Sequence, residues 1–448
     1  MEVVPPELLD VVVRFLRPVD APWALPYVSK GTRDALKPLR LPTGKVRAST
    51  VEKALRRAYA HRDAWALGTL DLSLSQVTDL SALAGCATLH SLYLSHCLGL
   101  VDASTLAGCT ALHTLDLSHC ERLTDVSALT SCTALHTLKL KGCEALTDVS
   151  LAGCTAFLID LSHCEGVTNV ALAACTALRT LKLYGCEALT DMTLDGCVTL
   201  HALDFSKSEA LEYLSLADCP ALHTLDLSKC EALGYLFLNG CGRVCALDLS
   251  EREELKEVSL TDCPALLTLD LSDCEALYYL WLEDCSLLHT LDLTNTGVSE
   301  LSSLTGCAAL QSLTLRHCEE LTDVSALADC ANLRMLDLSE CGGVTDVSAL
   351  AGCAALHDLD LGATEVGDVS PLADCPALHT LDLTECENVK DVSALAACAT
   401  LRKLDLAPHQ YFSPSQIAST DDFGFRIEEM GGIDTRDFSD AVEISWRG

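Results

Sequence analysis

A single short pattern, LxxLxL, recurs along most of this 448-residue chain and constrains its fold more than any other feature. The pattern begins 16 times between Leu67 and Leu401, mostly at intervals of 22 or 23 residues. A regular period in this range is the sequence signature of a repeat architecture, in which one small structural unit is stacked on the next. The sequence therefore predicts a solenoid rather than a domain with one central core.

Each unit is predicted to begin with a short β-strand. In segments such as LHTLDLSHC the leucines alternate with other residues, which is the period of two typical of a strand with one buried face. One such strand cannot bury its apolar face by itself. Strands of neighbouring units must therefore lie side by side in parallel and share one continuous core.

With this pattern the chain resembles the leucine-rich repeat family over about residues 67–406. The resemblance implies an α/β solenoid, a leucine-rich repeat horseshoe of about 16 units with parallel strands on its concave face. Convex segments such as LTDVSALAGC have room only for a short turn that begins at Asp125 or Asp148, which predicts 3₁₀ helices there. From Leu200 to Leu293 the repeat proceeds in steps of 11 residues, which predicts strand-like segments on both faces.

Two neighbouring units depart from the common length. The segment DVSLAGC lacks one residue relative to DVSALAGC, and TAFLIDL is one residue shorter than TALHTLDL. We expect a local irregularity of the sheet between Ser150 and Leu161.

The chain contains 26 cysteines, and two recur at fixed points of the repeat. One follows the strand, as Cys97 and Cys120 do, and the other precedes the next strand by about three residues, as Cys109 and Cys132 do. A free thiol is a small apolar group, so we interpret both series as buried structural cysteines. A disulfide framework or a metal array is the alternative, but it needs an oxidising compartment or clustered C-x-x-C pairs, and neither is evident. Pairs such as His119-Cys120 are interpreted as neighbours that face opposite sides of the chain.

Function is expected on the exposed positions of the concave strands, where aspartate and histidine recur. The functional interpretation is an acidic surface that binds a basic protein segment, and that loses affinity when histidines gain charge below about pH 6.5. Tandem duplication of one unit would produce the same columns without selection for a ligand, so both interpretations stay open. The candidate substrate-binding residues are Asp204, Asp226, Asp248, Asp270, Asp292, His201, His223 and His289.

The composition excludes several classes of function. A formal net charge of −34 repels nucleic acid and anionic membranes and attracts basic proteins. The sequence contains no G-x-x-x-x-G-K, H-E-x-x-H or G-x-S-x-G signature and nominates no nucleophile with its base. We therefore predict a non-catalytic protein with no cofactor, no bound metal, no nucleic-acid partner and no membrane partner.

The first residues lie outside the repeats and read as short helices. The segment VVPPELLDVVVRFLRPVDAPWALPYVSKGTRDALKPL resembles the F-box, although Thr32 stands where that motif usually has an aromatic residue. The matching residues are Pro6, Glu7, Leu8, Leu9, Phe15, Leu16, Pro18, Val28, Ser29, Lys30 and Arg33. The resemblance implies that Pro6, Leu8, Leu9, Phe15, Leu16, Pro18 and Val28 bind a Skp-type adaptor.

Four segments follow from these patterns. We expect an F-box-like helical region at 1–44, a capping helix at 45–66 that begins with the capping box of Ser49 and Glu52, the solenoid at 67–406, and a C-terminal cap and tail at 407–448.

Together the two resemblances imply a substrate-recognition subunit of a Skp-cullin-F-box ubiquitin ligase. Its N-terminal helices would bind the adaptor of the cullin complex, and its acidic concave face would bind a protein substrate, with basic substrates favoured. The first alternative is a stand-alone leucine-rich repeat scaffold whose N-terminal helices only cap the solenoid. The second is an extracellular recognition protein with disulfides. Because no secretory signal is visible, the sequence favours a cytoplasmic or nuclear location.

Overall fold

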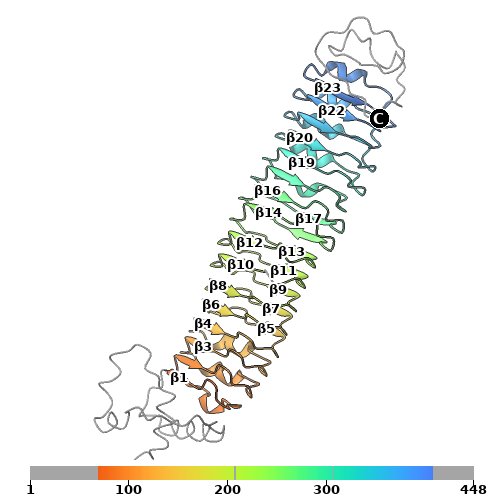
Figure 1. Ribbon diagram of the computed structural model, residues 1–448. Coiled ribbons are helices and arrows are strands. Elements are labelled where there is room, and N and C mark those ends of the chain that lie inside the picture. The colour runs from red at the N-terminus through yellow and green to blue at the C-terminus, as the bar shows by residue number, and fades with distance from the viewer. Residues whose placement is uncertain (1–68, 206–207, 305, 407–448) are drawn as a thin grey trace, which may run out of the picture. The chain divides into compact units, whose positions relative to one another are not determined.

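The computed structural model describes residues 69–205, 208–304 and 306–406. These residues belong to two compact units (Figure 1). Unit 1 contains the described residues up to 211 together with 224–230, and unit 2 contains 212–223 and the described residues from 231 onward. The segments predicted at 1–44, 45–66 and 407–448 lie outside the described residues. So do the adaptor-binding candidates Pro6, Leu8, Leu9, Phe15, Leu16, Pro18 and Val28.

Unit 1 is built from short parallel strands and 3₁₀ helices. Its front strands, which carry the LxxLxL pattern, are β1 (Thr69–Asp71), β2 (Ser91–Tyr93), β3 (Thr114–Asp116), β4 (Thr137–Lys139), β6 (Leu158–Asp160), β8 (Thr180–Lys182), β10 (Ala202–Asp204) and β12 (Thr224–Asp226). Its back strands are β5 (Asp148–Ser150), β7 (Asn169–Ala171) and β9 (Asp191–Thr193). Its 3₁₀ helices are η2 (Ser81–Leu83), η3 (Ser104–Gly108) and η4 (Ser127–Ser131). In Figure 1, β6 and β8 lie on one side of the repeats and β5 and β7 on the other.

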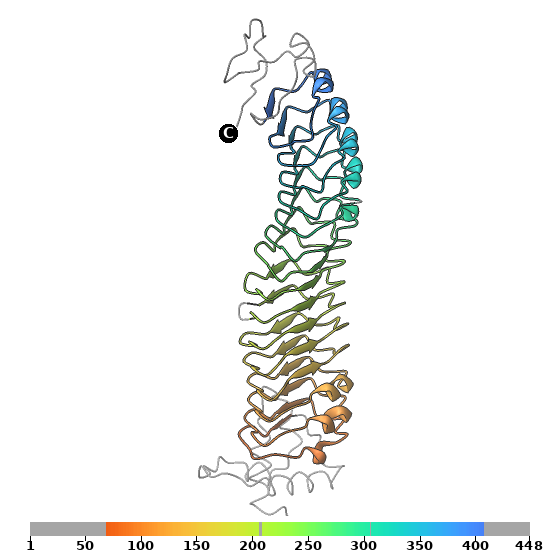
Figure 2. The ribbon, with the colours of Figure 1, turned by 90° about the vertical axis from the view of Figure 1, so that its right-hand side faces the viewer.

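Unit 2 is built from the same kinds of element as unit 1. Its repeats with back strands come first in the sequence, and its repeats with 3₁₀ helices follow. Its back strands are β11 (Tyr213–Ser215), β13 (Tyr235–Phe237), β15 (Glu257–Ser259) and β17 (Tyr279–Trp281). Its front strands are β14 (Ala246–Asp248), β16 (Thr268–Asp270), β18 (Thr290–Asp292), β19 (Ser312–Thr314), β20 (Met335–Asp337), β21 (Asp358–Asp360), β22 (Thr380–Leu383) and β23 (Lys403–Leu406), and they form one parallel sheet in that order. Its 3₁₀ helices are η5 (Ser302–Leu304), η6 (Ser325–Asp329), η7 (Ser348–Gly352), η8 (Ser370–Asp374) and η9 (Ser393–Ala397). Figure 2 shows these helices on the side of the repeats away from the front strands.

The core of each repeat lies between its front strand and its back segment. The strands pair in parallel so that equivalent leucines are direct partners, as Leu247, Leu269 and Leu291 are on β14, β16 and β18. These leucines are buried, whereas the residues on either side of them in each strand point away from the core. The predicted solenoid of stacked parallel strands is therefore confirmed for the described repeats.

The length of the back segment decides whether it becomes a 3₁₀ helix or a strand. The prediction for Asp125 is confirmed, since η4 follows it and the backbone N–H of Ser127 donates to Asp125 Oδ1 at 2.8 Å. The prediction for Asp148 is wrong, because this residue begins strand β5. DVSLAGC is one residue shorter, and a strand rises about 3.3 Å per residue against about 2.0 Å in a 3₁₀ helix. The shorter segment must extend in order to cover the same distance.

The 11-residue steps are explained in the same way. The strand-like segments on both faces that were predicted from Leu200 to Leu293 are present within each unit, but the pattern already begins at β5. No α-helix occurs in the described ranges, so the helical part of the predicted α/β class concerns residues outside them. Nor does any helix in the described ranges have the length and apolar character needed to cross a membrane.

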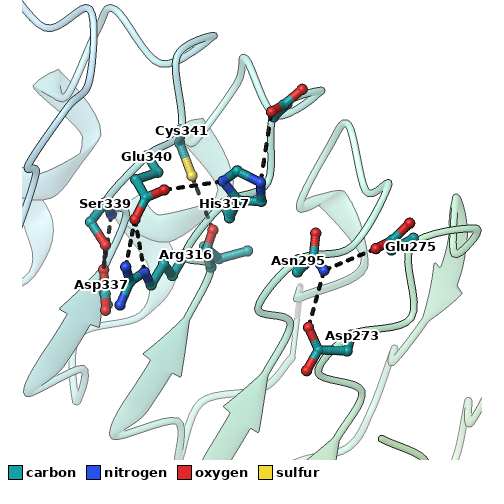
Figure 3. A network of polar contacts seen from close by, with 11 residues as sticks. Asp273, Glu275, Asn295, Arg316, His317, Asp337, Ser339, Glu340 and Cys341 are labelled. Carbon is teal, nitrogen blue, oxygen red and sulfur yellow. Dashed lines mark hydrogen bonds and ion pairs between the residues drawn. The ribbon is translucent and has the colours of Figure 1, made fainter. Parts of the chain in front are cut away.

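The cysteines form two buried series, as predicted. All 26 are free thiols, and Cys245 is the exposed member. A typical thiol donates to a carbonyl oxygen of the preceding repeat, as Cys341 Sγ does to Leu315 O at 3.0 Å (Figure 3). In two repeats a threonine takes this place, and its hydroxyl donates within its own turn, from Thr296 to Leu293 O at 2.8 Å. Most repeats therefore carry a small side chain with one hydrogen-bond donor at this buried position, whereas Arg252 occupies it in one repeat.

Candidate functional site

The front-face aspartates close the turn that follows each front strand. Asp248 Oδ1 accepts hydrogen bonds from the backbone N–H of Ser250 at 3.1 Å and from its hydroxyl at 2.7 Å, and these bonds lower the pKa of Asp248. Asp292 Oδ1 is used in the same way by Thr294, at 2.9 and 2.6 Å. Aspartate is suited to this position because its short carboxylate reaches the backbone two residues ahead. Since these bonds use Oδ1, the same carboxylate can also present Oδ2 to a partner.

The structure places the five predicted aspartates in two separate columns. Asp204 and Asp226 are direct Cα partners on β10 and β12 of unit 1. Asp248, Asp270 and Asp292 are direct partners on β14, β16 and β18 of unit 2. Beyond Thr314 on β19, four further aspartates in unit 2 continue in register, namely Asp337, Asp360, Asp382 and Asp405. The sequence marks this second set with the same DL pattern, but only the first set had been predicted to bind substrate.

The two units differ in how this column is charged. In unit 1, lysines occupy the column next to aspartates, with Lys139 Nζ 3.5 Å from Asp116 and Lys182 Nζ 3.6 Å from Asp160. In unit 2, by contrast, the column from β14 to β22 consists of aspartates and one threonine. The acidic front face is therefore concentrated in unit 2. We use the name acidic column for Asp248, Asp270, Asp292, Asp337, Asp360 and Asp382.

One compact ionic cluster stands beside the acidic column. Arg316 follows β19 and donates from Nη2 to Glu340 Oε1 at 2.6 Å and from Nε to the same oxygen at 3.0 Å (Figure 3). His317 Nδ1 lies 3.3 Å from Glu340 Oε2. The hydrogen bonds from Arg316 lower the pKa of Glu340 and raise that of Arg316. The cluster shows that this face can hold a guanidinium group by paired hydrogen bonds.

A neighbouring contact in Figure 3 links the turn after β16 to the turn after β18. Asn295 Nδ2 donates to Asp273 Oδ1 at 3.0 Å and to Glu275 Oε1 at 3.3 Å. Asp273 and Asn295 both have a positive φ, of 60° and 55°. Asparagine and aspartate tolerate this left-handed conformation better than most residues, so these side chains are also explained by the turn.

The predicted histidines lie at the start of their strands. His289 Nδ1 lies 2.5 Å from Leu287 O, and His201 Nδ1 lies 2.6 Å from Thr199 O, both in the histidine's own turn. His223 is the last residue of the segment 212–223 of unit 2, directly before β12 in the sequence. Stacked imidazole rings occur at other members of the series, with ring centroids 4.0 Å apart for His357 and His379 and 4.8 Å apart for His113 and His136. Sequence reasoning had recognised this series but had not singled out these pairs.

Asp360 is the member of the acidic column whose protonation changes most on folding. Burial, together with the neighbouring carboxylates Asp382 and Asp337, raises the pKa of Asp360 from 3.8 to about 6. A raised pKa means that folding favours the protonated form. The protonated Asp360 side chain therefore contributes its full stabilisation below about pH 3.8, and this stabilisation is lost as the pH rises through about 6.

We expect Asp360→Asn to stabilise the chain at pH 7 and to have little effect at pH 3.5. Asparagine is neutral at both values and can still accept the hydrogen bond that Gly362 N–H donates to Oδ1 at 2.8 Å. With allowance for solvent screening, the gain at pH 7 is about 1–2 kcal/mol in the free energy of unfolding. Urea titrations at the two pH values measure it. Asp116→Asn, which removes the partner of Lys139, is the control and should not stabilise at either pH. An equal gain at both pH values would contradict the argument.

No group of three or more His, Cys, Asp or Glu side chains in the described ranges is arranged to hold a metal ion. The His-Cys pairs of the sequence belong to turns in which His119, His163 and His317 adopt a positive φ of about 60°.

The comparison with known protein families gives one short match. A family model described as a leucine-rich repeat matches residues 108–129, which contain β3 and part of η4. No curated protein matches the sequence.

Three solved structures of bacterial proteins are similar to this chain, each at low identity and with a TM-score below 0.5. A leucine-rich repeat protein from Bacteroides ovatus has 15% identity and a TM-score of 0.40, and the match covers 84% of this chain and 88% of that one. The internalin InlF from Listeria monocytogenes has 17% identity and a TM-score of 0.32, with 82% and 98% covered. The functional domain of InlJ from the same organism, described as including a cysteine ladder, has 20% identity and a TM-score of 0.31, with 75% and 73% covered. The family model therefore matches one repeat of this chain, and the strand-and-turn unit of that repeat recurs on both sides of it in the described residues.

Proposed function

We propose that this chain is a non-catalytic protein-interaction scaffold whose unit 2 binds a basic segment of a partner protein on its front face. The observation that carries the proposal is the acidic column, in which aspartates on neighbouring strands are direct partners with no lysine between them. Leucine-rich repeat proteins generally bind protein partners on exposed strand residues, which is consistent with this assignment.

Electrostatics explains why a basic partner fits. Neighbouring strands lie about 4.8 Å apart, and two carboxylates at that distance repel by about 0.9 kcal/mol even at the dielectric constant of water. A row of ammonium or guanidinium groups placed over the column would relieve this repulsion. The net charge of −34 would also attract such a partner from a distance.

The test uses the full chain and a fluorescently labelled octalysine peptide. The variant Asp248→Asn/Asp270→Asn/Asp292→Asn removes three charges while each asparagine can still accept the hydrogen bonds of its turn. Fluorescence anisotropy at low salt should show about tenfold weaker binding, because each lost contact at an exposed site is worth a few tenths of a kcal/mol to about 1 kcal/mol.

A matched triple variant in unit 1 is the control. Asp71→Asn/Asp116→Asn/Asp160→Asn removes the same charge from a column in which lysines neutralise two of the aspartates. It should change binding by less than about twofold. Equal losses in both variants would mean that only net charge matters, and the front face of unit 2 would not be a site.

We further propose a more specific role for this scaffold, as the substrate-recognition subunit of a Skp-cullin-F-box ubiquitin ligase. It is supported by the resemblance of Pro6, Leu8, Leu9, Phe15, Leu16, Pro18 and Val28 to the F-box, followed in the same chain by leucine-rich repeats. The substrate would be a basic protein held by the acidic column, and ubiquitin transfer would belong to partner subunits. A cytoplasmic or nuclear location is part of this proposal, and the free thiols support a reducing compartment.

The experiment for this more specific role is a pull-down of the full chain with the Skp-type adaptor. The variant Leu8→Asp/Leu9→Asp should lose adaptor binding while its circular dichroism and melting stay those of the parent chain. If the unchanged chain does not bind the adaptor, the ligase assignment is wrong and the stand-alone scaffold remains. If the variant unfolds the first repeats instead, the N-terminal residues act as a cap.

A further inference from the structure

Aromatic side chains gather on the back strands of unit 2. Strands β11, β13, β15 and β17 lie next to one another in the back sheet (Figure 1). They and the residue before β17 carry most of the Phe, Tyr and Trp residues of the described ranges. We use the name aromatic face for Tyr213, Tyr235, Phe237, Tyr278, Tyr279 and Trp281.

Strand register brings these side chains into two parallel rows. The first row runs through Tyr213, Tyr235, Glu257 and Tyr279, and the second through Ser215, Phe237, Ser259 and Trp281. The rings are in contact with one another. The centroids of Tyr279 and Trp281 are 5.4 Å apart and stacked, and those of Tyr213 and Phe237 are 5.5 Å apart.

The aromatic face points away from the core. The alternate residues Leu214, Leu236 and Val258 are buried and fill the interior of the repeats. Tyr278 and Tyr279 are 47% and 52% exposed, whereas Ser259, on the outward face between Phe237 and Trp281, is only 6% exposed. The rings therefore cover the sheet and still offer their own faces to solvent.

Carboxylates alternate with these rings. Glu257 stands in the first row, between Tyr235 and Tyr279. Glu283, just beyond β17, accepts a hydrogen bond from the Thr261 hydroxyl at 3.2 Å. The chain already places one of its own cations on this surface, with Lys256 Nζ 6.0 Å from the centre of the Tyr235 ring and 3.8 Å from Glu254 Oε2. A cation between a ring and a carboxylate is thus the contact that this surface makes within the molecule.

We propose that the aromatic face binds an extended, arginine-bearing segment of a partner protein. A guanidinium group is planar and weakly hydrated, so it can stack on Tyr279 or Trp281 while it donates hydrogen bonds to Glu257 or Glu283. Lysine can be attracted by the same carboxylates but cannot stack as a plane. This surface is on the back sheet and is separate from the acidic column of the front sheet, so it does not depend on the proposal above.

The test begins from the full chain that carries Asp248→Asn/Asp270→Asn/Asp292→Asn, so that binding to the front face is reduced. Three labelled peptides of alternating sequence are compared at low salt: (Arg-Ala)4, (Lys-Ala)4 and (citrulline-Ala)4. Alternation places every charged residue on one face of an extended chain. Citrulline has the shape of arginine without its charge. We expect the arginine peptide to bind at least fivefold tighter than the lysine peptide and the citrulline peptide to bind at least tenfold more weakly.

Two variants locate this binding on the aromatic face. Tyr279→Leu/Trp281→Leu keeps apolar cover over the sheet but removes the rings, and should weaken arginine-peptide binding about tenfold and abolish the preference for arginine. Glu257→Gln keeps every ring and should weaken binding about threefold. Tyr184→Leu removes an exposed tyrosine from unit 1 and is the control that should change nothing. Thermal melting checks that each variant is folded.

Three results would overturn the inference. If a folded Tyr279→Leu/Trp281→Leu variant binds the arginine peptide as tightly as the parent chain, the aromatic face is not the binding site. Equal binding of the arginine and citrulline peptides would show that binding does not require a positive charge. Binding of the neutral glycan cellohexaose that depends on Tyr279 and Trp281, with no arginine-peptide binding there, would make the face a carbohydrate platform. The octalysine experiment tests the acidic column separately, and its result does not depend on any of these three outcomes.

Discussion

Gly343→Ala is expected to lower the free energy of unfolding of unit 2 by about 1–3 kcal/mol, the range for overpacking a well-packed site. A Cβ at Gly343 would lie 2.5 Å from Leu321 O and 3.0 Å from the Thr322 methyl carbon. The carbonyl belongs to the backbone of the preceding repeat, so relief requires the two repeats to move apart. Because repeats are stabilised by their contacts with neighbours, the strain would act on the interface between them.

Gly342→Ala is the matched control, one residue earlier in the same turn. A Cβ at Gly342 would meet nothing within 4 Å. The change should be neutral or stabilise by a few tenths of a kcal/mol, because alanine restricts the unfolded chain. Urea denaturation of both variants, followed by circular dichroism, measures the difference. Equal stability of the two variants would show that the repeats relax without cost.

The second prediction with a large expected effect concerns the rate at which thiols of the native chain react. The structure predicts that a single cysteine reacts rapidly. Of the 26 cysteines only Cys245 is exposed, so iodoacetamide should add one group to the native chain and 26 in urea. Burial raises the pKa of most interior thiols, to about 12 for Cys120 and about 11 for Cys132, so these form little thiolate at pH 8. At Cys175 and Cys318 a hydrogen bond with a neighbouring thiol outweighs burial and lowers the pKa, so these two are protected by burial alone. An interior thiol must also wait for local opening, which slows its reaction by at least about a thousandfold in a typical folded domain.

Mass spectrometry of the intact chain counts the added groups over time. Cys245→Ser should leave the native chain without a fast adduct and should leave its melting temperature unchanged. Several fast adducts in the native chain would contradict the buried series. A mass lower by two units per cysteine pair before reduction would reveal disulfides and favour an extracellular protein.

Much of the fold could be predicted from the sequence, because the repeat carries its own register. The alternation in LHTLDL places Leu115 inside the repeat and Asp116 outside, and stacking then makes equivalent positions partners. The same reasoning predicted the buried cysteines and the strands on both faces. It failed at Asp148, where the loss of one residue from the back segment turned a 3₁₀ helix into strand β5.

The candidate site could be predicted only in part. Asp248, Asp270 and Asp292 do form a column, as their identical position in the repeat required. Their use in closing turns was missed, because the same carboxylate position can serve the backbone or a ligand. The aromatic face was also missed as a site. The sequence had assigned those residues to the back of the repeats, and only the register of four strands shows that Tyr235, Glu257 and Tyr279 are direct neighbours.

The sequence by itself determined the stacked strands, the buried leucines and the buried thiols, since these depend on local alternation repeated at a constant period. The tertiary structure decided how each repeat meets the one before it. The same turn position holds Ala276 in one repeat and Gly166 or Gly343 in two others, and at both glycines a backbone carbonyl of the preceding repeat leaves too little room for a methyl group. Similarly, Lys139 neutralises Asp116 in unit 1, while Asp360 on β21 lies between two other aspartates and holds its proton to about pH 6. Such properties depend on distances between residues more than 20 positions apart in the chain, and those distances are fixed only when the repeats pack.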